Sequence, residues 1–182
     1  MRLDQLSGWA GDRVEIEWRS YLLRPRPEER SLEAFTRYTG SWERPAAVEA
    51  SISFNQWSGE HRPPSHSLPS SVAGKLAETY GPEAFHAFHF GLLEAYFTDN
   101  RTVSDRGVQI EVAEAAGIDG TDFAARLERE ERDLTNAVID DHNSAIESGV
   151  AGVPAVVVND AYPITGAQEL DLYQRIVDKL AD

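Results

Sequence analysis

No side chain in this 182-residue sequence is a cysteine, the residue that carries thiol chemistry in proteins. Without cysteine these residues supply no thiolate nucleophile, no disulfide and no sulfur ligand for a metal ion. Two of the five histidines, His86 and His89, stand three residues apart on a predicted helix, where both could reach one ion. Phenylalanines crowd that helix and no further ligand pattern accompanies the pair. We therefore expect no metal site and assign no catalytic residue.

A proline loop near the end of the sequence is the first candidate site. Residues 148–160, SGVAGVPAVVVND, have the form of a tight turn, a proline and a short buried strand. If the proline is cis, the preceding backbone N–H and C=O face outward, where an extended peptide can pair with them as an added strand. The alternative is a trans proline that opens a strand, because only about 5–6% of X–Pro bonds are cis. The candidate ligand-binding residues are Gly152, Val153 and Pro154.

Two further candidates come from short polar segments. The segment TGAQ, with Thr165, Gly166 and Gln168, predicts the start of the last helix, where backbone N–H groups favour an anion. A helix start that Thr165 simply caps is the alternative. His66, in PPSHSLPS, could act as a general base or hydrogen-bond donor. A loop histidine without a catalytic role is the alternative there.

Composition limits the classes of partner. Acidic residues outnumber basic ones 31 to 17, which gives a formal net charge of −14. Such a chain repels phosphate backbones and anionic membranes, so we expect no nucleic-acid or membrane partner. No segment approaches the roughly 20 apolar residues that span a bilayer, and the first residues do not resemble a signal peptide. We expect a cytoplasmic protein.

The pattern of apolar residues predicts an α/β protein. Val14, Ile16 and Trp18 alternate with charged residues, as in a strand with one polar face. The segment SISF, 51–54, is a weaker strand candidate. Near-continuous AVVV predicts an interior strand, and the pair ND predicts a hairpin to AYPIT. The predicted helices are the residues before Gly11, 31–38 capped by Ser31, 70–81, 82–97, 105–117 capped by Ser104, 121–146 and 167–180.

Several of these segments resemble one known family. The sequence GVAGVPAVVVND, followed by AYPITGAQ and an amphipathic helix, resembles the C-terminal half of the DsbA-type thioredoxin fold. The resemblance is closest to the FrnE-like branch, which neighbours 2-hydroxychromene-2-carboxylate isomerases and kappa-class glutathione transferases. AYFTDNRTVSDRGVQIEVAEAAGID, PPSHSLPSSVAGKLAE and VEIEWRSYLLRP are similar to other parts of that branch, so the resemblance runs from about Leu3 to Asp182.

The resemblance implies a fold and roles for the candidate residues. The fold is a thioredoxin-like α/β fold with a large helical insertion between the second strand and the cis-Pro strand. It implies one domain, 1–182, with a thioredoxin part at 1–65 and 149–182 and the insertion at 66–148. The bond before Pro154 would be cis, His66 would lie near the mouth of the active site, and the segment from Thr165 to Gln168 would help to hold a glutathione carboxylate.

One departure from the family leaves alternatives open. Members of the family begin with a strand and a Cys-Pro-x-x motif, whereas this sequence starts at what resembles the end of the following helix. Without that first strand, the strand at 14–18 and the Pro154 strand would each lack a neighbour. Three explanations are open: the start has been placed too late, a second chain or SISF fills the gap, or the fold has reorganised.

The functional expectations follow from the resemblance and the missing cysteine. The family implies an oxidoreductase-type protein, and this chain is expected to be redox-inactive, so whether it is an enzyme is left open. One alternative is a non-catalytic module that binds a peptide or glutathione in the cis-Pro groove. Another is a cysteine-free isomerase or glutathione-transferase relative. That alternative needs a polar side chain facing Pro154 from the first helix, and Ser7 is the residue in that segment that could supply it. The one cofactor that these features allow is glutathione. The partners that they allow are a peptide, a small thiol, or a second copy of the chain bound at the edge of the sheet.

Overall fold

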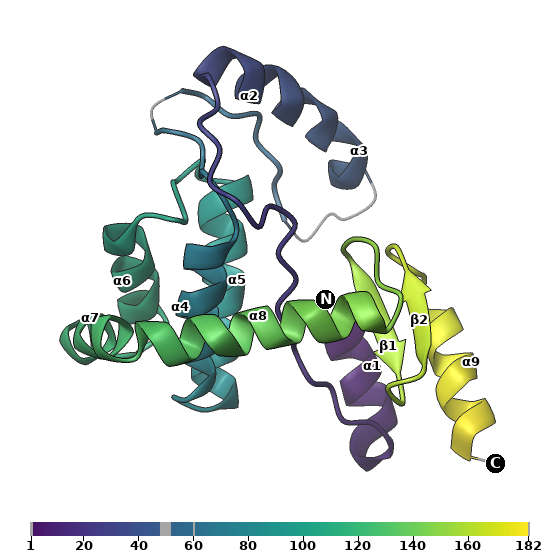
Figure 1. Ribbon diagram of the computed structural model, residues 1–182. Helices are drawn as coiled ribbons and strands as arrows, with labels where there is room; N and C mark the ends of the chain where they lie inside the picture. Colours follow the sequence, from purple (N-terminus) through teal and green to yellow (C-terminus); the bar gives the residue numbers. More distant parts are fainter. Residues whose placement is uncertain (1, 48–51, 60, 182) are drawn as a thin grey trace. The chain divides into compact units, whose positions relative to one another are not determined.

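The computed structural model describes residues 2–47, 52–59 and 61–181 (Figure 1). These residues form two compact units. One unit holds the residues up to Tyr21 together with those from Asp141 onward, and the other holds Leu22–Asp140. The described residues of 22–65, which the sequence assigns to the thioredoxin part, pack with the helical residues that follow them. The predicted insertion boundary, 66–148, stays a prediction, since compactness alone does not test it.

The Leu22–Asp140 unit is built from helices. Ser31 caps the first of them as expected, since its hydroxyl accepts a hydrogen bond from the N–H of Ala34 at 3.3 Å. Pro82 occupies the first turn of its helix, where a missing N–H costs nothing. The helices of the described part of this unit are α2 (Leu32–Thr39), η2 (Gly40–Trp42), α3 (Glu43–Ala46), α4 (Leu68–Glu78), α5 (Pro82–Phe97), α6 (Arg106–Ala115), α7 (Gly120–Arg129) and the first part of α8 (Glu131–Glu147).

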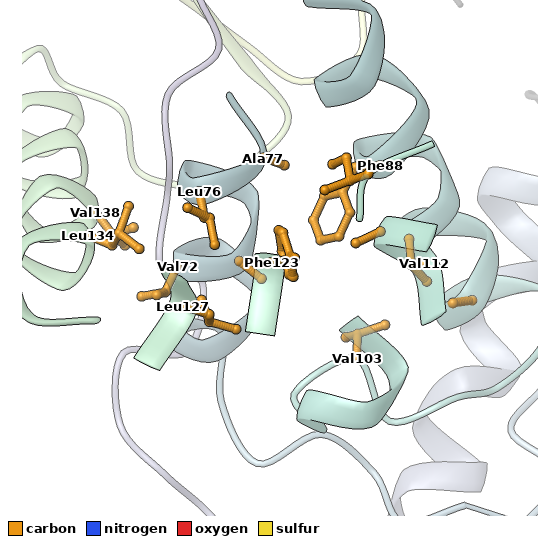
Figure 2. Packing of buried hydrophobic residues seen from close by; sticks show 14 of the residues in the cluster. Val72, Leu76, Ala77, Phe88, Val103, Val112, Phe123, Leu127, Leu134 and Val138 are labelled. Carbon is orange, nitrogen blue, oxygen red and sulfur yellow. The ribbon is translucent and has the colours of Figure 1, made fainter. Parts of the chain in front are cut away.

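The apolar faces of these helices meet in one core. Figure 2 shows the side chains of α4, α5, α6, α7 and α8 that fill it. Leu76, Phe88, Phe123 and Val138 have no exposed surface at all. Burial of this many aliphatic and aromatic side chains supplies the main stabilisation of the unit.

A second, aromatic cluster joins α2 to the end of α5. Its buried members are Phe35, Trp42 and Trp57, and Phe54, Tyr96 and Phe97 pack against them. The buried amide of Asn100 holds the loop that carries Trp57. Its Oδ1 accepts a hydrogen bond from the N–H of Ser58 at 2.8 Å, and its Nδ2 donates to the carbonyl of Asn55 at 3.0 Å.

Two helix starts differ from the sequence prediction by one or two residues. Asp105 caps α6 instead of Ser104, because its carboxylate accepts from the N–H groups of Gly107 and Val108. Asp119 caps α7, which begins at Gly120 and not at Thr121; the Asp119 carboxylate accepts from the N–H of Asp122 at 2.8 Å. In both places a carboxylate competes with a neighbouring hydroxyl.

The single long helix predicted at 121–146 is wrong. The structure has two helices, α7 and α8, with a break at Glu130, whose backbone is non-helical (φ −103°, ψ 2°). Arg126 holds the Glu130 carboxylate through two hydrogen bonds of 3.0 and 3.1 Å, which fixes the side chain beside the preceding turn. Ile146, expected in the buried stripe, is 52% exposed.

The other unit contains a small sheet between helices. Its elements are α1 (Arg2–Ala10), η1 (Gly11–Arg13), the end of α8, β1 (Ala155–Val158), β2 (Tyr162–Thr165) and α9 (Leu170–Ala181). Helix α1 packs on α9, where Leu6, Ala10 and Tyr173 are buried. Two ion pairs lie beside this contact: Arg2 of α1 pairs with Glu169, just before α9, at 3.6 Å, and Arg13 of η1 pairs with Asp178 of α9 at 3.0 Å.

The predicted hairpin is confirmed. Strands β1 and β2 are antiparallel, and Val156 lies opposite Ile164. Asn159 and Asp160 make the turn with φ of 49° and 54°, the left-handed conformation that this residue pair tolerates. The last helix begins at Leu170, three residues later than expected, and Leu180 is 52% exposed instead of buried.

The strand predicted at 14–18 is not formed. Val14, Ile16 and Trp18 are half-buried and their charged neighbours are exposed, so the predicted alternation of faces is present. A strand also needs a neighbouring strand that pairs with its N–H and C=O groups, and no described residue forms such a β-ladder with residues 14–18. No strand forms at 52–54 either; the first residue of SISF lies outside the described residues.

We expect the helical core to be sensitive to cavities. Leu76→Ala should lower the free energy of unfolding by about 2–5 kcal/mol, because the fully buried site cannot fill the space left by the side chain. Leu23→Ala is the matched control, because Leu23 is 58% exposed and its loss should change stability by less than about 0.5 kcal/mol. Urea denaturation measures both, and equal effects would contradict the assignment of the core.

Candidate functional site

The proline loop begins at the end of α8. The N–H of Gly149 donates to the carbonyl of Ile146 and the N–H of Val150 donates to that of Ala145, both at 2.9 Å. Gly149 has a φ of +84°, so this pair of bonds is a Schellman ending that requires a left-handed residue. Val150 is buried, which anchors the loop before it turns outward to Pro154.

The loop presents Val153 and Pro154 at the surface. The peptide bond between them is cis, Val153 is 51% exposed and Pro154 is exposed. The carbonyl of Pro154 accepts a hydrogen bond from the N–H of Gly166 at 2.9 Å, which brings the loop beside the end of β2. The loop of Gly152, Val153 and Pro154 therefore lies next to Gly166.

The register of the hairpin determines which backbone groups of β1 remain unpaired. Hydrogen-bonded and non-hydrogen-bonded pairs alternate along an antiparallel ladder. Val157 lies opposite Pro163, which has no N–H, and Pro154 already bonds with Gly166, so the even-numbered residues of β1 face β2. The N–H and C=O groups of Ala155 and Val157 therefore point to the other edge, where no described residue bonds to them.

Thr165 and Gln168 do not lie at a helix start as the sequence predicted. Thr165 is the last residue of β2, and its carbonyl accepts a hydrogen bond from Gln168 Nε2 at 2.9 Å. The first turn of α9 begins beyond them at Leu170, so the helix N-terminus offers no reason to place an anion at these two residues. Burial raises the pKa of the nearby Tyr173 hydroxyl, and the Gln168 backbone and the Arg2 charge act in the opposite direction.

His66 belongs to the helical unit. Its Nδ1 lies 2.8 Å from the hydroxyl of Ser65, and the side chain is half-buried. The segment around it is held to the chain after Leu22 by the hydrogen bond from the N–H of Ser67 to the carbonyl of Arg24 at 2.9 Å. His66 and Pro154 therefore belong to different units of the chain.

The remaining sequence candidates lie elsewhere. The rings of His86 and His89 contact Phe90, with centroids 4.4 and 5.3 Å away. Among the described residues, no group of three His, Cys, Asp or Glu side chains is placed to hold a metal ion. Ser7 is exposed on α1. No helix within the described ranges is both long and apolar enough to cross a bilayer.

Comparison with known protein families gives one match over nearly the whole chain. The model of the DSBA-like thioredoxin domain matches residues 2–178. This chain belongs to that family. The fold is therefore thioredoxin-like, with most residues helical and a small sheet.

Two similar proteins agree with the fold of this DSBA-like domain. The crystal structure of the probable DsbA oxidoreductase SCO1869 from Streptomyces coelicolor superposes with a TM-score of 0.73 at 20% identity, covering 98% of this chain and 81% of that one. The uncharacterised protein YwbO of Bacillus subtilis (strain 168) is 22% identical over 182 residues, covering 92% of this chain and 82% of YwbO.

Sequence reasoning anticipated that the Pro154 strand would lack a neighbour, but it missed which backbone groups of the DSBA-like domain's β1 stay unpaired. The signal was present, because a hairpin turn at Asn159 and Asp160 pairs Val157 with Pro163. A proline opposite a residue indicates a non-hydrogen-bonded pair, and this alone assigns the unpaired groups to Ala155 and Val157.

The backbone of Gly166 gives a direct test of the site's geometry. Gly166→Ala should lower the free energy of unfolding by about 1–2 kcal/mol, because φ is +81° and an L side chain disfavours that conformation. An added Cβ would meet no atom closer than 3.9 Å, so the cost is conformational.

Gly152→Ala is the matched control. A Cβ at Gly152 has no atom within 4 Å and its φ is not in the left-handed region, so stability should change by less than about 0.5 kcal/mol. Denaturant unfolding of both variants is the measurement. A greater loss for Gly152→Ala would mean that the loop is held differently.

Proposed function

We propose that this DSBA-like domain binds an extended peptide or a small peptide thiol such as glutathione and does not exchange disulfides by itself. The observation that supports the proposal is the unpaired edge of β1 beside the exposed Val153–Pro154 loop. An extended ligand could pair there as an added strand through the N–H and C=O groups of Ala155 and Val157.

The chemistry of disulfide exchange supports the second half of the proposal. Exchange begins when a thiolate attacks a disulfide sulfur and forms a mixed disulfide. These 182 residues contain no cysteine, so they provide no atom that could form that bond. A glutathione bound at β1 would keep its own thiol, and the domain would act as a binding module.

The proposal also includes the branch of the family and the cellular location. We place the chain in the FrnE-like branch of the family on the segments that resemble it, with the loop of Gly152 and Pro154 as the most specific. A cytoplasmic location stays a prediction from the sequence. The similar Streptomyces coelicolor protein is a probable DsbA oxidoreductase, and this favours a thiol- or peptide-related role for the fold that the two proteins share.

The absence of exchange chemistry is directly measurable. In an insulin-reduction assay with dithiothreitol, these 182 residues should give the same rate of precipitation as buffer, because no thiolate is present to relay electrons. A cysteine-containing thioredoxin serves as the positive control. A rate clearly above buffer would refute this half of the proposal.

Ligand pairing at the edge should appear in NMR titrations. Reduced glutathione, or an uncharged extended tetrapeptide without a thiol, should shift the amide signals of Ala155 and Val157 more than those of Val156 and Val158. The second pair already bonds with β2, so a ligand on the other edge leaves its hydrogen bonds unchanged. Equal shifts for all four amides, or none, would contradict edge pairing.

A proline substitution tests the open edge of β1 without removing a hydrogen bond to β2. Val157→Pro removes an N–H that the β1–β2 ladder does not use, so the hairpin should persist and binding should weaken by up to about tenfold. Val157→Thr keeps the N–H and should bind as the unchanged chain does. If the ligands do not bind and light scattering shows a dimer that Val157→Pro abolishes, a second copy occupies the edge and the ligand proposal fails.

A further inference from the structure

Two arginines of the helical unit lie over the same two aromatic rings. The guanidinium carbon of Arg24 is 6.0 Å from the centroid of Phe35 and 5.7 Å from that of Tyr38. The guanidinium carbon of Arg30 is 5.7 Å from each of these centroids. Phe35 is 1% exposed and Tyr38 is 48% exposed, so the two positive charges lie beside a ring that solvent still reaches.

Within the part of the chain that the structure describes, these two arginines differ from most others by having no carboxylate partner. Most arginines elsewhere lie within ion-pair distance of an acidic side chain; Arg37, for example, is 2.8 Å from Glu33 on α2. No acidic side chain of the described residues lies within 4.0 Å of Arg24 or Arg30. In a chain with a net charge of −14, Arg24 and Arg30 place two cations over one pair of rings with no acidic side chain of the described residues to neutralise them, which favours an anion as partner.

The surrounding structure holds this pair in place. The N–H of Arg24 donates to the hydroxyl of Ser67 at 3.1 Å, and its carbonyl accepts from the N–H of Ser67 at 2.9 Å. On the ring side, Phe35 packs edge-on against Trp57, with centroids 5.0 Å apart. The backbone of Arg24 and the ring of Phe35 are therefore fixed before any ligand arrives.

The arginines also create a positive field at a neighbouring hydroxyl. Burial raises the pKa of Tyr96 to about 12, and the charges of Arg24 and Arg30 oppose that rise. Tyr96 packs against the same cluster, with its ring centroid 5.7 Å from that of Trp57.

We propose that Arg24, Arg30 and Tyr38 form a binding site for a phosphate monoester that carries a planar, apolar group. The site is independent of the Pro154 loop and of the function proposed for it. Two guanidinium forks match the oxygens of one phosphate and carry the two positive charges that its dianion needs near pH 7. The exposed part of the Tyr38 ring offers a face on which the planar group can stack.

The other role open to the arginines is to cover the rings of Phe35 and Tyr38 by cation–π contact alone. That role predicts that the arginines contribute to stability and bind nothing. A binding site predicts saturable binding of phosphate esters, so the two roles give different results in the same titration.

The test is calorimetric titration of the full 182-residue chain with inorganic phosphate, methyl phosphate and phenyl phosphate. We expect all three to bind, and phenyl phosphate to bind about two- to tenfold more tightly than methyl phosphate because of Tyr38. No saturable binding would overturn the site. Equal affinity for the two esters would overturn the role of Tyr38.

Substitutions locate the binding. Arg24→Gln and Arg30→Gln should each weaken phenyl phosphate binding about ten- to hundredfold, since each removes charged hydrogen bonds. Arg26→Gln is the matched control: it removes the same charge from an exposed residue of the same segment and should change Kd by less than about twofold. Equal weakening by all three variants would show non-specific attraction and overturn the proposal.

A measurement on the unchanged chain covers the case in which a variant fails to fold. The side-chain Nε–H signals of Arg24 and Arg30 should shift on addition of phenyl phosphate while that of Arg26 stays in place. Shifts of all three, or of none, would contradict the site.

Discussion

The structure of the smaller unit depends on a backbone constraint: a strand is stable inside a sheet when the polar groups of both its edges are paired. Strand β1 is paired along one edge only, and its four residues are half-buried although their AVVV sequence suits an interior strand. Few buried side chains compensate, chiefly Leu6, Ala10, Val150 and Tyr173. A two-stranded sheet with so small a core is marginal by itself, so the packing of the helices beside it matters for its stability.

The helical unit differs from the smaller unit, because packed side chains and not strand pairing stabilise it. Fully buried aliphatic and aromatic residues from five helices fill one core, and an aromatic cluster around Phe35 and Trp57 forms another. Backbone groups there are satisfied within the helices and by caps such as Asp105 and Asp119. A rigid surface of this kind can hold charges such as those of Arg24 and Arg30 in fixed positions, which the open hairpin cannot do.

Local features were predictable from the sequence where a residue carries its own structural signal. Ser31, Pro82 and the Asn159–Asp160 turn marked their elements correctly, because capping, proline geometry and left-handed turns are local properties. The break at Glu130 was hidden, because the apolar positions on either side keep a helical spacing through it. The strand at 14–18 failed for a different reason: alternation predicts two faces, whereas pairing depends on a partner elsewhere. Within the candidate site, the loop around Pro154 was found from its sequence, and the start of α9 was placed too early because Gly166 lies in the turn that follows β2 and does not begin a helix.

The central claim is that β1 has one paired and one open edge, and amide hydrogen exchange of the ligand-free chain tests it most directly. The N–H groups of Val156 and Val158 should exchange slowly because they bond with β2, whereas those of Ala155 and Val157 should exchange at rates close to those of an unprotected chain. An alternating pattern of protection along four consecutive residues is the predicted result. Equal protection of all four amides would mean that the second edge is already occupied, and the account of the site would be wrong.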